Sequence, residues 1–163
     1  MVHLILSGLL ATLSGCGHTI DTTLAITYVN GQGMPQSSAE TLTWYRKAAE
    51  QGNVMGQVNL GQMYANGQGV PQSDSEAVAW YRKAAEQGHA AAQRGLGWMY
   101  ANGRGIPQDA VKAHMWESLA LSNGEAKAGA LLDEVAKQLT PSQITQAQAL
   151  AHACRASNYK ACE

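Results

Sequence analysis

Apolar side chains recur three and four positions apart through most of the chain, which is the spacing of one face of an α-helix. Ala92, Leu96 and Tyr100 form one such stripe, and another runs from Ala77 to Ala85 with charged residues left for solvent. Alanine and glycine, which are depleted in strands, are abundant between the larger apolar residues. The pattern therefore predicts an all-α protein.

The same pattern recurs every 36 residues in four independent ladders. Two segments, 44–52 and 80–88, share the identical sequence Trp-Tyr-Arg-Lys-Ala-Ala-Glu-Gln-Gly. A pair of helices this short cannot cover its own apolar stripes, so neighbouring units must stack. We expect a short right-handed α-solenoid of helix-turn-helix repeats. The ladders are Tyr28, Tyr64 and Tyr100; Trp44, Trp80 and Trp116; Pro35, Pro71 and Pro107; and Gly52, Gly88 and Gly124.

Loop residues mark the ends of each unit. Asn102 and Gly103 predict the end of a helix with backbone in the left-handed region, and Pro107 suits the residues before the next helix. Gly61 and Gly97 lie in the middle of helices, which predicts close contact with a partner helix. The units are residues 16–52, 53–88 and 89–124, followed by a C-terminal helical cap in 125–163.

The cap has its own helix signals. An apolar stripe predicts one helix from Glu125 to Gln138. Thr140 and Gln143 flank Pro141 in the pattern of a capping box, which predicts a final helix that ends at about Cys154. The three recurrent tryptophans of the repeats are expected to lie in the core.

Composition and charge exclude some classes of function. The chain has 163 residues, of which 45% are hydrophobic, with 17 Gly and no Phe, so its helices must pack closely around a modest core. Its formal net charge is −1, and no run of Lys or Arg exceeds two residues. Nucleic acid is therefore not an expected partner.

The N-terminus resembles a secretory signal. Residues 4–13 form an apolar run that is too short to span a bilayer. The run leads into Leu13-Ser14-Gly15-Cys16, which resembles the lipobox of bacterial lipoproteins. Residues 1–15 would then be removed, and Cys16 would carry the lipid that anchors the protein in the cell envelope. Residues 1–3 carry no Lys or Arg, which a signal peptide usually has, and the alternative is a frayed apolar helix in which Cys16 is incidental.

The repeats resemble those of the Sel1-like family, which is related to the tetratricopeptide repeats. The matching segments are 60–64 (Leu-Gly-Gln-Met-Tyr), 67–70 (Gly-Gln-Gly-Val) and 80–88. The first copy departs from the family pattern between His18 and Tyr28, and the third departs from it after Trp116. The resemblance implies stacked helical hairpins that bind a protein or peptide on their concave face.

The resemblance also implies where that face lies. If the first helix of each unit follows tetratricopeptide geometry, its variable positions line the groove. Trp98 stands out there, because the equivalent position in the preceding unit is Gln62. An alternative is that Trp98 packs under the cap. The expected partner-binding residues are Trp98, Arg94, Asn102, Gln62, Val58 and Asn66.

Cys154 and Cys162 have a spacing that resembles that of cysteine-rich Sel1-like proteins, in which a disulfide joins neighbouring helices. Two free thiols are the alternative. A disulfide and an export signal would both place the protein outside the cytosol. His152 beside these cysteines offers too few ligands for a zinc site.

Other motifs carry little chemistry. The string from Ser157 to Lys160 matches Ser-x-x-Lys but has no accompanying Lys-Thr-Gly, and the Gly-x-Gly loops follow no strand. We therefore expect no catalytic residue, cofactor or metal. The leading hypothesis is a non-catalytic interaction module of the bacterial envelope. The alternatives are a weak β-lactamase or penicillin-binding activity, as attributed to cysteine-rich Sel1-like proteins, and a cytosolic adaptor.

Overall fold

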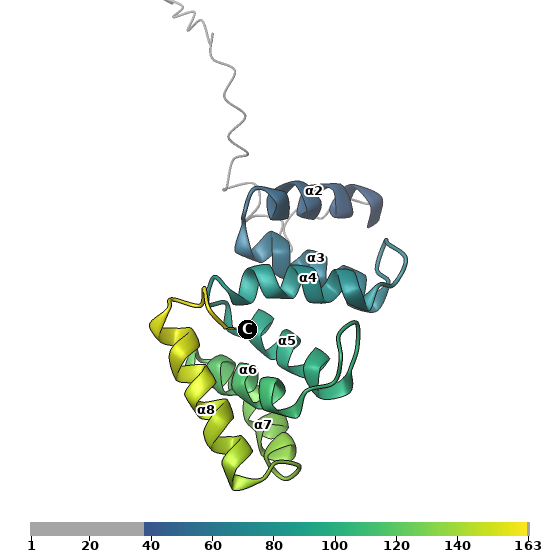
Figure 1. Ribbon diagram of the computed structural model, residues 1–163. Coiled ribbons are helices and arrows are strands. Elements are labelled where there is room, and N and C mark those ends of the chain that lie inside the picture. Colours follow the sequence, from purple (N-terminus) through teal and green to yellow (C-terminus); the bar gives the residue numbers. More distant parts are fainter. Residues whose placement is uncertain (1–37, 163) are drawn as a thin grey trace, which may run out of the picture.

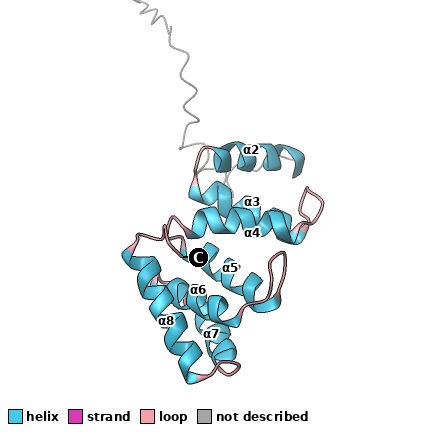
Figure 2. Cartoon of the chain, in the orientation of Figure 1, coloured by secondary structure: helices cyan, strands magenta, loops and turns pink. Residues whose placement is uncertain are grey.

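The computed structural model describes residues 38–162, and all of its regular elements are helices (Figures 1 and 2). Each helix packs against the next along the chain from α2 to α7. Within the described residues there is no strand, so the all-α prediction is confirmed. The helices are α2 (Ser38–Glu50), α3 (Val54–Asn66), α4 (Asp74–Ala85), α5 (Ala90–Asn102), α6 (Ala110–Ser122), α7 (Ala128–Ala136) and α8 (Pro141–Ala156).

Equivalent loops join α3 to α4 and α5 to α6. Gly103 ends α5 with a φ of 63°, and its N–H donates to the carbonyl of Met99. Gly105 also has a positive φ, of 68°, and a Cβ there would collide with the backbone of Asp74 at the start of α4. Asp109 then caps α6 by accepting from the N–H of Lys112. The glycine-rich loop thus lets successive units approach closely.

Small residues at the helix contacts explain how a core without Phe is filled. A Cβ on Gly61 of α3 would lie 2.9 Å from the ring of Tyr81 on α4, so glycine is needed for that ring to come this close to the helix. Gly97 of α5 makes the equivalent contact with Glu117 of α6. The predicted close approach at both glycines is confirmed. Four alanines of α4 and α5 are fully buried between these contacts, namely Ala77, Ala84, Ala85 and Ala92.

The recurrent tryptophans differ in burial. Trp116 is fully buried, as expected of a core residue. Trp80 and Trp44 are only half-buried, so the prediction is wrong in part for these two. The Lys83 ammonium lies 4.0 Å from the centre of the Trp80 ring and covers it with a cation–π contact. Trp80 is therefore shielded from solvent in part by the Lys83 side chain rather than by the core.

The cap is arranged differently from the repeats. Helix α8 packs mainly against α6, beside which it lies in Figure 1. Leu119 of α6 is fully buried, whereas the equivalent Lys83 of α4 is exposed. The second half of α6 is therefore covered where the equivalent part of α4 faces solvent.

The helix boundaries of the cap agree in part with the sequence pattern. The capping box is present: the Thr140 hydroxyl accepts from the N–H of Gln143, and the Gln143 side chain accepts from the N–H of Thr140. Helix α7 begins at Ala128 rather than Glu125, because residues 123–127 form the turn that leaves α6. Helix α8 continues past Cys154 to Ala156.

Several predictions concern the N-terminal part of the chain. The signal segment 1–15, Cys16 and the first helix of the first repeat lie outside the described residues. Among residues 38–162, no helix has the length and apolar character that crossing a membrane requires.

Candidate interaction surface

Trp98 is an exposed aromatic residue on the first helix of the third repeat. It lies on α5 with 37% of its surface exposed. The Asn102 side chain donates to the carbonyl of Trp98 over 2.8 Å and so closes the last turn of the same helix. Because the equivalent residue on α3 is Gln62, the fold itself does not require a tryptophan here.

An ion pair from two different units supports the Trp98 ring. The Arg104 guanidinium carbon lies 5.1 Å from the centre of this ring. The same guanidinium binds Asp74 with two parallel hydrogen bonds, Nε to Oδ2 over 2.8 Å and Nη2 to Oδ1 over 2.6 Å. A bidentate pair fixes both the distance and the plane of the guanidinium. Trp98, Arg104 and Asp74 are called the Trp98 cluster below.

The remaining predicted residues on α3 have two outcomes. Gln62 and Asn66 are exposed and lie on the same side of the helix, four positions apart. Val58 is only 4% exposed and belongs to the hydrophobic core, so its assignment to the binding face is wrong. Val58 points into the core because α3 packs on both α2 and α4. Met55 of α3 is 40% exposed, although it was not among the predicted binding residues.

Arg94 has intramolecular partners. Its Nε lies 3.7 Å from a carboxylate oxygen of Glu125, beyond hydrogen-bonding distance, and this atom is buried. The positive charge of Arg94 also opposes the effect of burial on Tyr81 and Glu117, the pKa values of which burial raises. The positive charge of Arg94 therefore lies close to Glu125, Tyr81 and Glu117 within the molecule.

Glu117 is a fully buried acid at the centre of these contacts. Its carboxyl group touches the backbone of Gly97, and neither oxygen has a hydrogen-bond partner among the described residues. The pKa of Glu117 is raised to about 8, chiefly by burial; the nearby charge of Arg94 opposes this rise and that of Glu125 adds to it. The side chain is consequently neutral below that pH. Glu117 occupies the position that Tyr81 occupies in the preceding unit.

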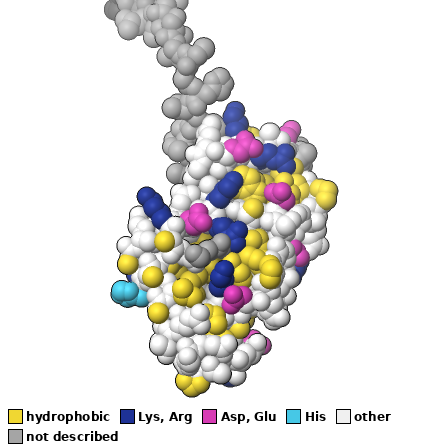
Figure 3. All heavy atoms as spheres, viewed as in Figure 1, with side chains coloured by type: hydrophobic (Ala, Val, Ile, Leu, Met, Phe, Trp, Pro, Cys, Tyr) yellow, Lys and Arg dark blue, Asp and Glu magenta, His cyan; other side chains and the backbone are white. Residues whose placement is uncertain are grey.

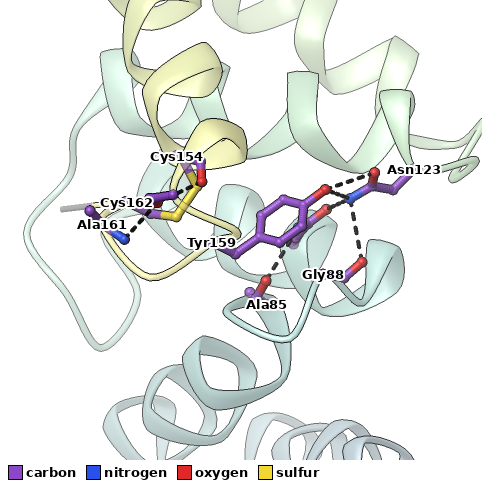
Figure 4. Close-up of a disulfide and its surroundings, with 9 residues drawn as sticks. Ala85, Gly88, Asn123, Cys154, Tyr159, Ala161 and Cys162 are labelled. Carbon is purple, nitrogen blue, oxygen red and sulfur yellow. Dashed lines mark hydrogen bonds between the residues drawn. A yellow bond between two sulfur atoms is a disulfide. The ribbon is translucent and has the colours of Figure 1, made fainter.

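A disulfide between Cys154 and Cys162 closes the C-terminal loop, as the cysteine spacing led us to expect (Figure 4). Ser157 lies inside this loop, where its hydroxyl donates to the carbonyl of Cys154 and accepts from the N–H of Ala161. The serine of the Ser-x-x-Lys string thus holds the loop. Between residues 38 and 162, no group of three or more His, Cys, Asp or Glu side chains is placed to hold a metal ion.

Comparison with protein families identifies the repeats. The Sel1 repeat model matches residues 24–53, 54–89 and 90–125, which together make up more than half of the chain. The chain belongs to the Sel1 repeat family. No curated protein matches it.

Two solved structures of Sel1 repeat proteins resemble the chain. The first is c5321, a protective antigen present in uropathogenic Escherichia coli strains that displays an SLR fold. The TM-score between c5321 and this chain is 0.71, and their sequence identity is 33%. The match covers 84% of this chain and 30% of c5321. The second is a Sel1 repeat protein from Oxalobacter formigenes, with a TM-score of 0.61 at 37% identity, over 68% of this chain and 45% of that one. This chain thus spans less than half the length of either protein.

The Sel1 repeats also contain site residues that sequence reasoning missed. Arg104 and Asp74 were not predicted to contact the Trp98 ring. The signal was present, because Arg104 replaces Gln68 of the preceding Gly-x-Gly loop. Comparing the third repeat with the second would have marked Arg104 and Trp98 together as departures from the repeat pattern. Their mutual contact depends on how the loop folds back over α5.

Proposed function

We propose that this Sel1 repeat protein binds a protein or peptide through the surface formed by α3 and α5, with Trp98 as its anchor. The observation that carries the proposal is the Trp98 cluster, in which an exposed indole is held by a guanidinium that is itself fixed to Asp74. Tryptophan and arginine are enriched among residues that dominate binding energy. A side chain already held in place loses less entropy when a partner binds.

The surroundings of Trp98 suit a protein partner. Gln62, Asn66 and Asn102 offer amide groups on the exposed side of α3 and α5, and Met55 adds an apolar side chain. In the view of Figure 3, apolar side chains of the described residues lie among Lys and Arg rather than forming one uninterrupted patch. Exposed amides beside an apolar anchor fit the polar rim of a protein interface.

We further propose that the protein acts in the bacterial cell envelope, lipidated at Cys16. The lipobox-like segment before Cys16 supports this, and so does the disulfide, because disulfides persist outside the reducing cytosol. The intact mass of the native protein tests the proposal. A mature chain that begins at a lipid-bearing Cys16 supports it, whereas a full-length chain with an unmodified Cys16 contradicts it.

Photo-crosslinking in cells tests the binding surface. A photoreactive phenylalanine analogue at Gln62 should crosslink one defined partner, and the same group at Gln148, an exposed glutamine of α8, should not. Trp98→Ala in the Gln62 background should remove the crosslink. Leu150→Ala is the matched control, because Leu150 is also 37% exposed but lies on α8. Equal crosslinking from both positions, or a crosslink that survives Trp98→Ala, would overturn the proposal.

A further inference from the structure

A chain of side-chain amides links successive repeats at the turns between α2 and α3 and between α4 and α5. In each of the two described first helices, α3 and α5, a buried glutamine near the start donates to a carbonyl at the end of the preceding helix and accepts from a side-chain amide just past the second helix of its own unit. In the second repeat the bonds are Gln57 Nε2 to the Ala49 carbonyl, 3.3 Å, and Gln87 Nε2 to Gln57 Oε1, 2.8 Å. In the third they are Gln93 Nε2 to the Ala85 carbonyl, 3.2 Å, and Asn123 Nδ2 to Gln93 Oε1, 2.8 Å.

Tyr159 completes this chain of amides at its C-terminal end. Asn123 is one methylene shorter than the equivalent Gln87, and the Tyr159 hydroxyl makes two contacts with its amide (Figure 4). Asn123 Nδ2 donates to this hydroxyl over 3.0 Å, and the hydroxyl donates to Asn123 Oδ1 over 3.1 Å. The Tyr159 ring lies on Gly88, where a Cβ would be only 3.0 Å from it.

The backbone that delivers Tyr159 is held in an unfavourable conformation. Asn158 and Tyr159 have φ values of 55° and 64°, in the left-handed region that residues with side chains rarely adopt. Two constraints act on this segment: the disulfide from Cys154 to Cys162 and the hydrogen bond from the Tyr159 N–H to the Cys154 carbonyl, 2.8 Å. The sequence separation of the two cysteines is 8, so the closed loop leaves the segment few other conformations.

We propose that this loop is a redox-sensitive clamp, in which the disulfide keeps Tyr159 docked on Gly88 and Asn123. Reduction by a dithiol adds two electrons and two protons, breaks the sulfur–sulfur bond and leaves Cys154 and Cys162 as thiols, while the dithiol becomes a disulfide. The freed segment then leaves the left-handed region, and Tyr159 departs. Reduction thereby uncovers Asn123, Gln93 and Gly88 at the edge of the solenoid.

Hydrogen exchange on the full chain tests the clamp, with Cys16→Ser introduced so that no other thiol takes part. The oxidised protein is compared with the same protein in excess dithiothreitol. We expect amide exchange in residues 155–162 to rise on the order of 50-fold, the factor that closing a loop of this length contributes. Exchange in the turn at residues 86–91 should rise with it, while α3 stays unchanged. Unchanged exchange in both segments after reduction would overturn the proposal.

Two variants separate docking of Tyr159 from general stability. Tyr159→Ala in the oxidised protein should expose the turn at residues 86–91 as reduction does, although the disulfide is intact. Tyr159→Phe keeps the ring on Gly88 and removes only the hydroxyl, so its effect on the same turn should be smaller. If Tyr159→Ala leaves exchange in this turn unchanged, or if reduction raises exchange equally in every helix, the clamp is contradicted.

Discussion

Glu117→Gln should stabilise the protein at neutral pH, because the substitution keeps the shape of the side chain and removes its titration. Glu117 is fully buried against Gly97, with no hydrogen-bond partner for either oxygen among the described residues. Its ionised form would place a negative charge near Glu125, with only Arg94 to offset it. The folded protein therefore favours the neutral acid.

The size of the effect follows from the pKa of Glu117, which is about 8 in the folded protein against an ordinary value of 4.5. Because the folded-state value is the higher one, the stability that neutral Glu117 confers is complete below about pH 4.5. It is lost progressively as the pH rises towards 8. At pH 7 the pH lies about 2.5 units above the ordinary pKa of 4.5, so keeping Glu117 protonated lowers the free energy of unfolding by on the order of 3 kcal/mol. The glutamine variant avoids this loss.

Thermal and urea unfolding of both proteins between pH 4 and pH 9 measures this difference. We expect the variant and the parent to be about equally stable near pH 4, and the melting temperatures to differ by roughly 10 °C at pH 7. Glu134→Gln is the control, because Glu134 is exposed on α7 and should show no such dependence. A stability difference that is the same at pH 4 and pH 8 would refute the assignment of a raised pKa to Glu117.

Other substitutions test the helix contacts, the cap and the Trp98 cluster. Gly61→Ala should destabilise the protein by about 1–2 kcal/mol because its Cβ meets an aromatic ring, whereas Gly129→Ala, where the nearest atom is 4.0 Å away, should stabilise it slightly; urea unfolding compares them. Thr140→Ala should cost about 1 kcal/mol through loss of the capping box, and faster exchange of the first amides of α8 should accompany the loss. Asp74→Asn should weaken partner crosslinking less than Trp98→Ala does, because it loosens the guanidinium but leaves the indole.

The helical units could be predicted from the repeat pattern, because an apolar residue that recurs every 36 positions marks a packing contact that each unit makes. The positions of Gly61 and Gly97 in the middle of helices predicted close helix contacts. The capping-box pattern of Thr140 and Gln143 predicted the start of α8. The packing of α8 on α6 was less accessible, since it depends on surfaces far apart in sequence. Leu119, which stands where the preceding repeat has Lys83, indicates only that this part of α6 is covered.

The interaction surface was predictable only in outline. Trp98 and Gln62 were found because they occupy one variable position, and both are exposed. Val58 was placed wrongly because shared register does not fix burial: α3 turns this side chain into the core, whereas the longer Arg94 reaches out towards Glu125. The contact of Arg104 with Trp98 could not be read from helix periodicity, because Arg104 lies in a loop.

The measurement that tests the central claim most directly is a calorimetric titration. It compares the affinity of the purified partner, once crosslinking has identified it, for the parent protein and for two variants. We expect Trp98→Ala to raise the Kd by about 30-fold, as removal of an anchor residue typically does. Leu150→Ala, with the same exposed fraction of its surface, should leave the Kd within about twofold. Equal Kd values for the parent protein and Trp98→Ala would contradict the assignment of the α3 and α5 surface as the binding face.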